Sequence, residues 1–191
     1  MTILGIGGIL GEAAAAILKD GVLAGAVEQR KLVRRLRPGE LPEEAIACCL
    51  AMAGLRVRDV DCVAVARPLA AGPEAAMHLA LRARFPDSRI IVVDHHLAHA
   101  ASAYFASPFP EAVVLTLDAT GDYRCGARWI ASGNGLALDK ELYYPDSLGD
   151  LYGRVTALLG FEARADEHKV QWLSARGDDR FRPLFAEILG L

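Results

Sequence analysis

The order of short apolar segments constrains the fold of this chain more than any other feature. A first apolar run, residues 2–9, ends in glycines, and two further runs at residues 13–18 and 22–28 flank an Asp-Gly pair. Asp-Gly between two apolar runs is a strong signal for a tight hairpin. The alanine-rich run at residues 13–18 has a helical composition, but a short apolar run that ends in such a turn fits a strand better. The chain is therefore predicted to open with three consecutive strands.

Strands and helices are then expected to alternate. Proline is tolerated in the first turn of a helix, which places a helix start near Pro42. The elements predicted after the opening strands are a helix from Pro42 to about Gly54, a strand over 61–66, a helix over 74–85, a strand over 89–93 and a helix over 95–106. A second pass then has strands over 111–117, 125–131 and 136–143, a helix over 148–159 and a helical tail in two pieces over 166–191.

The two passes share one form. Each begins with an apolar strand that ends in a small-residue turn, continues with two more strands joined by a glycine turn, and then reaches a helix. This is the order of a ribonuclease-H-like repeat, and two such repeats facing each other form the fold of actin and the sugar kinases. The sequence therefore predicts an α/β chain with a complete first repeat over residues 1–110 and a partial second repeat with a helical tail over 111–191.

Composition excludes several classes of protein. The formal net charge is −3, which argues against nucleic acid as a partner, and 53% of the residues are hydrophobic, enough for a substantial core. The four cysteines form no C-x-x-C pair, so we expect reduced thiols in a cytoplasmic protein rather than a zinc site. The chain begins without the pattern of a signal peptide, and no apolar run is long enough to suggest a membrane partner.

The most informative segment for chemistry is Asp94-His95-His96-Leu97-Ala98-His99, which follows an apolar strand and opens a predicted helix. His95 and His99 are four residues apart and would project from the same helix face, a spacing that suits a metal ion. His96 would point elsewhere. Asp118, at the end of another apolar strand, could supply a carboxylate ligand. Each feature also has an ordinary interpretation, as helix-start histidines satisfied by solvent and as a turn aspartate.

Taken together, these segments resemble one family. Residues 94–109 and Asp118-Ala119-Thr120-Gly121 are similar to the carbamoyltransferases that modify nodulation factors, cephalosporins and aminoglycosides. Weaker similarity covers residues 26–28 with Arg34, and the blocks at 147–152, 159–161 and 167–170. The amino-terminal domain of that family is related to the protein that transfers threonylcarbamoyl groups to tRNA.

The resemblance implies a function and a set of site residues. His95, His99 and Asp118 would bind a divalent metal, usually described as iron, with a further aspartate from the second repeat. Gly121, Lys169 and Arg34 would lie near ATP or the carbamoyl adenylate made from carbamoyl phosphate and ATP. The carbamoyl group would then pass to a hydroxyl of a small-molecule acceptor in a biosynthetic reaction.

The sequence departs from the family at several positions, and no catalytic residue is assigned. Leu10 stands where the family has a histidine thought to assist the acceptor hydroxyl, and Glu12 stands where it has an aspartate. Leucine cannot accept a proton. The block at 171–175 also differs, and family members are several times longer. Two functions therefore stay open: a carbamoyltransferase module that is inactive alone, or a non-catalytic or regulatory relative that keeps a metal or nucleotide site. An unfinished second sheet also predicts a homodimer or partner subunit, unless the apolar tail covers it.

Overall fold

Two separate sheets organise the chain. The computed structural model describes residues 1–34, 39–67 and 74–190. Its strands are β1 (Thr2–Gly7), β2 (Ala14–Lys19), β3 (Val22–Glu28), β4 (Cys62–Ala66), β5 (Arg89–Val93), β6 (Glu111–Leu117), β7 (Arg124–Ser132) and β8 (Gly135–Tyr143). Its α-helices are α1 (Glu43–Met52), α2 (Glu74–Arg84), α3 (His95–Phe105), α4 (Leu148–Leu158), α5 (Glu167–Ser174) and α6 (Arg182–Leu189).

The first sheet has five strands in the order β3-β2-β1-β4-β5. β1, β2 and β3 pair as antiparallel neighbours, whereas β4 and β5 run parallel to β1. The β2–β3 hairpin turns at Asp20 and Gly21, which both have positive φ angles, of 51° and 81°. Positive φ angles at both central residues are typical of a type I′ turn, whose twist matches that of the flanking strands. The prediction of a strand rather than a helix at residues 13–18 is confirmed.

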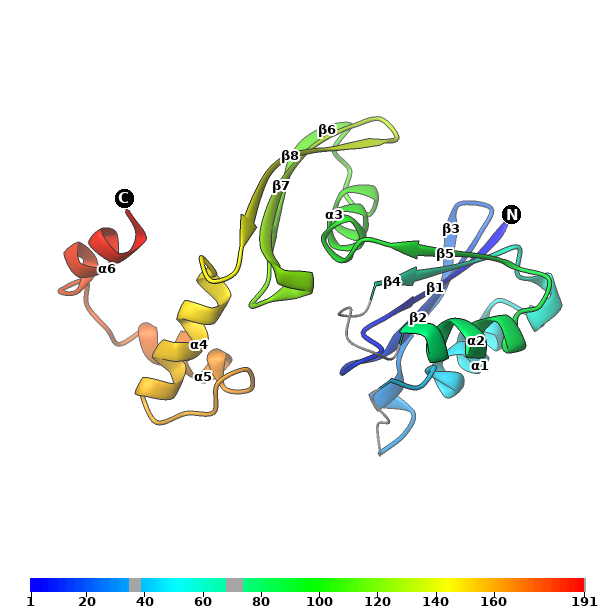
Figure 1. Cartoon of the computed structure of the whole chain (residues 1–191), viewed down its shortest axis with the longest axis horizontal. Helices are drawn as coiled ribbons and strands as arrows, with labels where there is room; N and C mark the ends of the chain where they lie inside the picture. The colour runs from blue at the N-terminus through cyan, green and yellow to red at the C-terminus, as the bar shows by residue number, and fades with distance from the viewer. Residues whose placement is uncertain (35–38, 68–73, 191) are drawn as a thin grey trace.

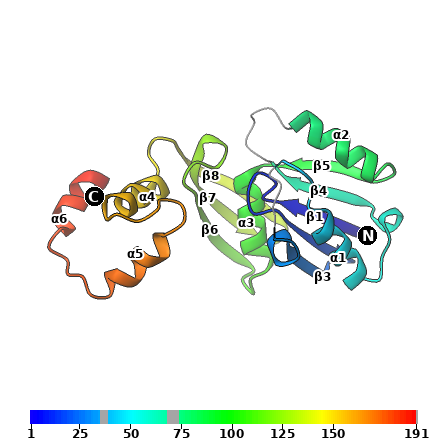
Figure 2. The same ribbon diagram turned by 90° about the horizontal axis from the view of Figure 1, so that it is seen from below.

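One face of this sheet carries the main core. Alternate residues of β1, β2 and β4 are buried in one core with residues of α1 and α2. The ribbon views show these two helices beside the five-stranded sheet (Figures 1 and 2). The largest fully buried side chains of this core are Phe85, Leu4, Ile17, Ile46, Leu81, Val63 and Val65. Helices α1 and α2, which precede α3 in the sequence, therefore cover this face of the first sheet.

The second sheet has the order β6-β7-β8, and each strand is antiparallel to the next. Helix α3 packs on one face of it, with Ala100 and Tyr104 buried against Trp129 of β7 and its neighbours. Both views place α3 between the two sheets (Figures 1 and 2). On the other face, Val113, Leu115 and Leu117 of β6 are each more than 60% exposed. The second sheet is thus covered on one face only within the described residues.

Helices α4, α5 and α6 extend away from the sheets at the opposite end from the amino terminus (Figure 1). The tail is helical in two pieces, as predicted, but it does not lie over the exposed face of β6. Phe181, Leu184 and Ile188 are 60%, 51% and 55% exposed. Among the described residues, no helix combines the length and the apolar character needed to cross a bilayer. Residues 30–37 hold five lysines or arginines, and residues 35–37 of this basic stretch lie outside the described residues.

Candidate metal centre

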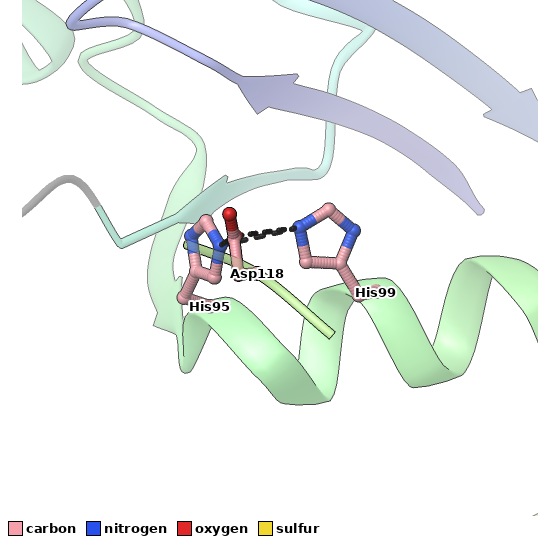
Figure 3. Close-up of side chains that lie close together, drawn as sticks. All are labelled: His95, His99 and Asp118. Carbon is pink, nitrogen blue, oxygen red and sulfur yellow. Dashed lines mark hydrogen bonds and ion pairs between the residues drawn. The ribbon is translucent and has the colours of Figure 1, made fainter. Parts of the chain in front are cut away.

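The site begins at the amino terminus of α3, where the chain leaves β5. Asp94 is the cap of this helix, because its Oδ1 accepts a hydrogen bond from the backbone N–H of Leu97 at 3.0 Å. Aspartate is among the best residues at this position, since it satisfies an amide that the helix itself cannot pair. The cap fixes where the helix starts and therefore which face His95 and His99 share. Both imidazoles project from that face toward Asp118 (Figure 3).

The structure brings together the three residues predicted as metal ligands. The Nε2 atom of His95 lies 2.7 Å from Oδ2 of Asp118 and 3.2 Å from Nε2 of His99. The Nε2 atom of His99 is 3.8 Å from the same Asp118 oxygen. One donor atom from each residue falls within 4.8 Å of the other two. Asp118 reaches this position because β6 ends there, beside the first turn of α3.

The charges within this group shift its pKa values in opposite directions. The hydrogen bond to Asp118 raises the pKa of His95, and the same bond lowers the pKa of the Asp118 carboxyl. Burial, with the neighbouring His95 charge, lowers the pKa of His99. His99 is therefore biased toward its neutral form, which is the form that binds metal.

The donor set fits a divalent metal ion. Two imidazole nitrogens and one carboxylate oxygen on the wall of a cavity form the arrangement that suits non-haem Fe(II), because open coordination positions are left for other ligands. The cavity has a volume of about 400 Å³ and is lined by His95, His99, Asp118 and Gly121 on one side and by residues 7–12 with Arg67 on the other. Each of the three candidate ligands is partly exposed and lines this cavity.

Two glycines allow the walls of this cavity to approach closely. A Cβ atom on Gly121 would lie 2.9 Å from Nε2 of His96 and 3.1 Å from Oδ2 of Asp118. Gly8 has a φ of +65°, and a Cβ atom there would lie 2.3 Å from the carbonyl oxygen of Glu12. Both positions therefore exclude side chains. For Gly121, which was predicted as a cofactor residue, this gives a steric reason for glycine beside the ligands.

His96 faces away from the cavity and is 1% exposed. Its Nε2 lies 2.5 Å from the carbonyl oxygen of Arg124, and its Nδ1 lies 2.8 Å from Oγ1 of Thr116. A carbonyl oxygen only accepts, so Nε2 of His96 donates to it. His96 thus hydrogen-bonds α3 to β6 and to the first residue of β7.

Two other predicted residues do not lie at this cavity. Lys169, on α5, pairs with Asp166 at 2.7 Å. Arg34 is exposed and, like Lys169, is absent from the residues that line the cavity. Their contact with a nucleotide stays a prediction. Leu10 and Glu12, two of the positions that depart from the family, do line it.

Asp122 was not predicted as a site residue from the sequence. This residue has a left-handed φ of 48°, and Tyr123 after it has a φ of 69°. Both carboxylate oxygens of Asp122 are buried and have no hydrogen-bond partner among the residues that the structure describes. Burial raises the pKa of this carboxyl. Its position next to Gly121 was the one available signal, but aspartate is common in turns and the spacing is not distinctive.

Comparison with known proteins gives a family and a fold. The family described as "Carbamoyltransferase N-terminus" matches residues 74–190. The nodulation protein NolNO of Sinorhizobium fredii is 32% identical over 94% of this chain and 30% of its own length. An uncharacterised protein of Synechocystis sp. is 31% identical over 98% of this chain and 36% of its own length. The chain thus spans about a third of the length of these relatives.

Two solved structures show the fold. ROK hexokinase from Thermus thermophilus matches with a TM-score of 0.59 and 14% identity, covering 96% of this chain and 72% of that one. YeaZ from Pseudomonas aeruginosa matches with a TM-score of 0.54 and 17% identity, covering 76% of this chain and 70% of that one. The predicted α/β fold of the actin and sugar-kinase class is confirmed.

Proposed function

The chain belongs to the family of carbamoyltransferase amino-terminal domains, and from that premise we propose that it is the metal-holding part of an enzyme that transfers a carbamoyl group to a hydroxyl. The donor would be a carbamoyl adenylate formed from carbamoyl phosphate and ATP, and the acceptor a hydroxyl-bearing small molecule. We further propose that residues 1–110 and 111–191 are one complete and one partial copy of the same repeat.

The convergence of His95, His99 and Asp118 on one cavity carries this proposal. These three side chains would hold a divalent metal, with iron favoured by the two-imidazole, one-carboxylate set. Such an ion supplies Lewis-acid chemistry, offsetting the negative charge of a phosphate group beside the reacting carbonyl. The glycines at positions 8 and 121 let the cavity walls pack closely, and Arg67, which pairs with Glu74 at 3.6 Å, adds a positive charge to the cavity lining.

A second candidate function rests on Leu10. This side chain is 38% exposed and lines the cavity at the position where the family has a proton-accepting histidine. Loss of a general base typically lowers a rate by about 10²–10⁴-fold. A non-catalytic or regulatory relative that keeps the metal site is therefore the alternative to a carbamoyltransferase.

Anaerobic titration of the purified chain with Fe(II) tests the metal site. We expect one equivalent to bind, and we expect His95→Ala and Asp118→Ala to abolish binding. His78→Ala, which removes an exposed histidine of α2, is the matched control and should bind as the unaltered chain does. Equal binding by all variants would refute the assignment.

Turnover assays separate the two functions. In an assay that contains ATP, carbamoyl phosphate and one acceptor, we expect no transfer by the isolated chain. The acceptors to test are an aminoglycoside and a nodulation-factor oligosaccharide. Addition of the remaining two thirds of the family's length, as a longer chain or a partner, should restore transfer if this is an enzyme. No transfer under those conditions, with metal bound, would favour the non-catalytic relative.

A further inference from the structure

Arg124, the first residue of β7, contacts the side chains of the two residues that flank His95, Asp94 and His96. Its Nη1 donates to Oδ1 of Asp94 at 2.9 Å, and its carbonyl oxygen accepts from Nε2 of His96 at 2.5 Å. We propose that Arg124 is a positioning residue that fixes His95 for metal binding. This inference rests on the proposed metal site, but it concerns a residue that does not contact the metal.

The contact with Asp94 reaches the first turn of α3 directly. The Asp94 oxygen that accepts from Arg124 is the same Oδ1 atom that caps the helix through the N–H of Leu97. A shift of the arginine would therefore move the cap, and with it the residue that follows the cap, His95. Ligands of this kind lose binding geometry when displaced by fractions of an ångström.

Arg124 is itself held from the other side. Its Nε atom lies 2.6 Å from Oε1 of Glu141 on the neighbouring strand β8. The Arg124 side chain is only 18% exposed, so its two ion pairs are screened by solvent less than surface pairs are. Arg124, ion-paired with carboxylates on both sides, thus connects the second sheet to the helix that carries the imidazoles.

The next residue along the chain holds the third ligand. The carbonyl oxygen of Cys125 accepts from the backbone N–H of Asp118 at 2.8 Å. Two adjacent residues of β7 therefore fix both ligand-bearing segments, Arg124 that of His95 and Cys125 that of Asp118. This dipeptide therefore helps to hold Nε2 of His95 and Oδ2 of Asp118 at their 2.7 Å separation.

The test compares two arginines of the same strand. Arg124→Gln removes the ion pair to Asp94 but keeps the backbone carbonyl that accepts from His96, whereas Arg128→Gln removes an ion pair to Asp139 that lies within the sheet. Loss of an outer partner of a metal ligand typically lowers affinity by about 10–100-fold. We expect that loss of Co(II) affinity for Arg124→Gln, with a changed Co(II) absorption spectrum, and less than a twofold change for Arg128→Gln. Equal affinities and spectra for the two variants would overturn the proposal.

A second variant separates positioning from folding. Asp94→Ser keeps a good helix cap but removes the carboxylate that Arg124 contacts. If Arg124→Gln does not fold, Asp94→Ser is expected to show the same loss of Co(II) affinity with an unchanged melting temperature. Full affinity in a folded Asp94→Ser protein would contradict the proposal.

NMR of the metal-free chain tests the role of Arg124 even if the proposed metal site is wrong. In the metal-free chain, the imidazole NMR signals of His95 report its hydrogen bond to Asp118. These signals should change in Arg124→Gln and Asp94→Ser and stay constant in Arg128→Gln. If the unaltered chain binds no metal, the metal site is refuted while these signals still decide the role of Arg124. Identical signals in all variants would refute it.

Discussion

The two sheets of this chain differ in how they are covered, and the candidate site lies where they meet. The five-stranded sheet has a core of fully buried side chains from β1, β2 and β4 packed on α1 and α2. The three-stranded sheet buries one face against α3 and leaves Val113, Leu115 and Leu117 exposed on the other. We infer that the first sheet supplies most of the stability, whereas the second supplies Asp118 and the residues that hold α3.

The largest expected effect is on the core of the first sheet. Phe85→Ala removes a ring that is 0% exposed and should lower the free energy of unfolding by about 3–5 kcal/mol. Leu115→Ala, on the open face of β6, is the matched control and should change it by less than about 0.5 kcal/mol. Urea denaturation of the two variants measures the difference. Equal losses would mean that the outer face of β6 is covered in solution.

The next effect concerns the junction of the two regions. Gly121→Ala would place a methyl group too close to the His96 ring and the Asp118 carboxylate, so these side chains would have to move. We therefore expect metal affinity to fall by about 10-fold or more. Gly11→Ala is the control, because it lines the same cavity but a Cβ there meets nothing within 4 Å. Isothermal titration with Co(II) compares them. A loss in Gly11→Ala as large as that in Gly121→Ala would argue against the steric account.

A smaller, pH-dependent effect follows from the His95–Asp118 pair in the metal-free chain. The raised pKa of His95 means that its contribution to stability is present below the ordinary histidine pKa and is lost as pH rises through the raised value. The lowered pKa of Asp118 means that its contribution is lost as pH falls through the lowered value. The stability difference between the unaltered chain and Asp118→Asn should therefore be largest between about pH 4 and pH 6.5. Thermal melts in EDTA across pH 3–9 measure it, and a difference that is flat with pH would contradict the pairing.

The smallest effect expected is a weak self-association through the second sheet. The exposed face of β6 predicts a homodimer at micromolar concentration, because covering such a face stabilises the pair. Leu115→Asp should return the mass to that of a single 20.5 kDa chain in light scattering. A mass of 20.5 kDa for the unaltered chain at every concentration would rule the dimer out.

The elements, and the approach of His95, His99 and Asp118 to one another, could be predicted from the sequence because most of their signals are local. The Asp20-Gly21 turn fixes the first hairpin, and four-residue spacing fixes the shared face of His95 and His99. The role of Arg124 could not be predicted, since its partner Asp94 is 30 residues earlier and no spacing rule connects a strand start to a helix cap. Asp122 escaped prediction for the same reason: its burial comes from the packing around it rather than from its neighbours in sequence.

The account depends most on the claim that His95, His99 and Asp118 together hold one divalent metal between the two sheets. Anomalous diffraction from crystals grown with Fe(II) tests it directly. The expected result is a single strong peak about 2.0–2.2 Å from Nε2 of each histidine and from a carboxylate oxygen of Asp118. A peak elsewhere on the chain, or imidazoles turned to opposite sides of α3 with no peak between them, would contradict it.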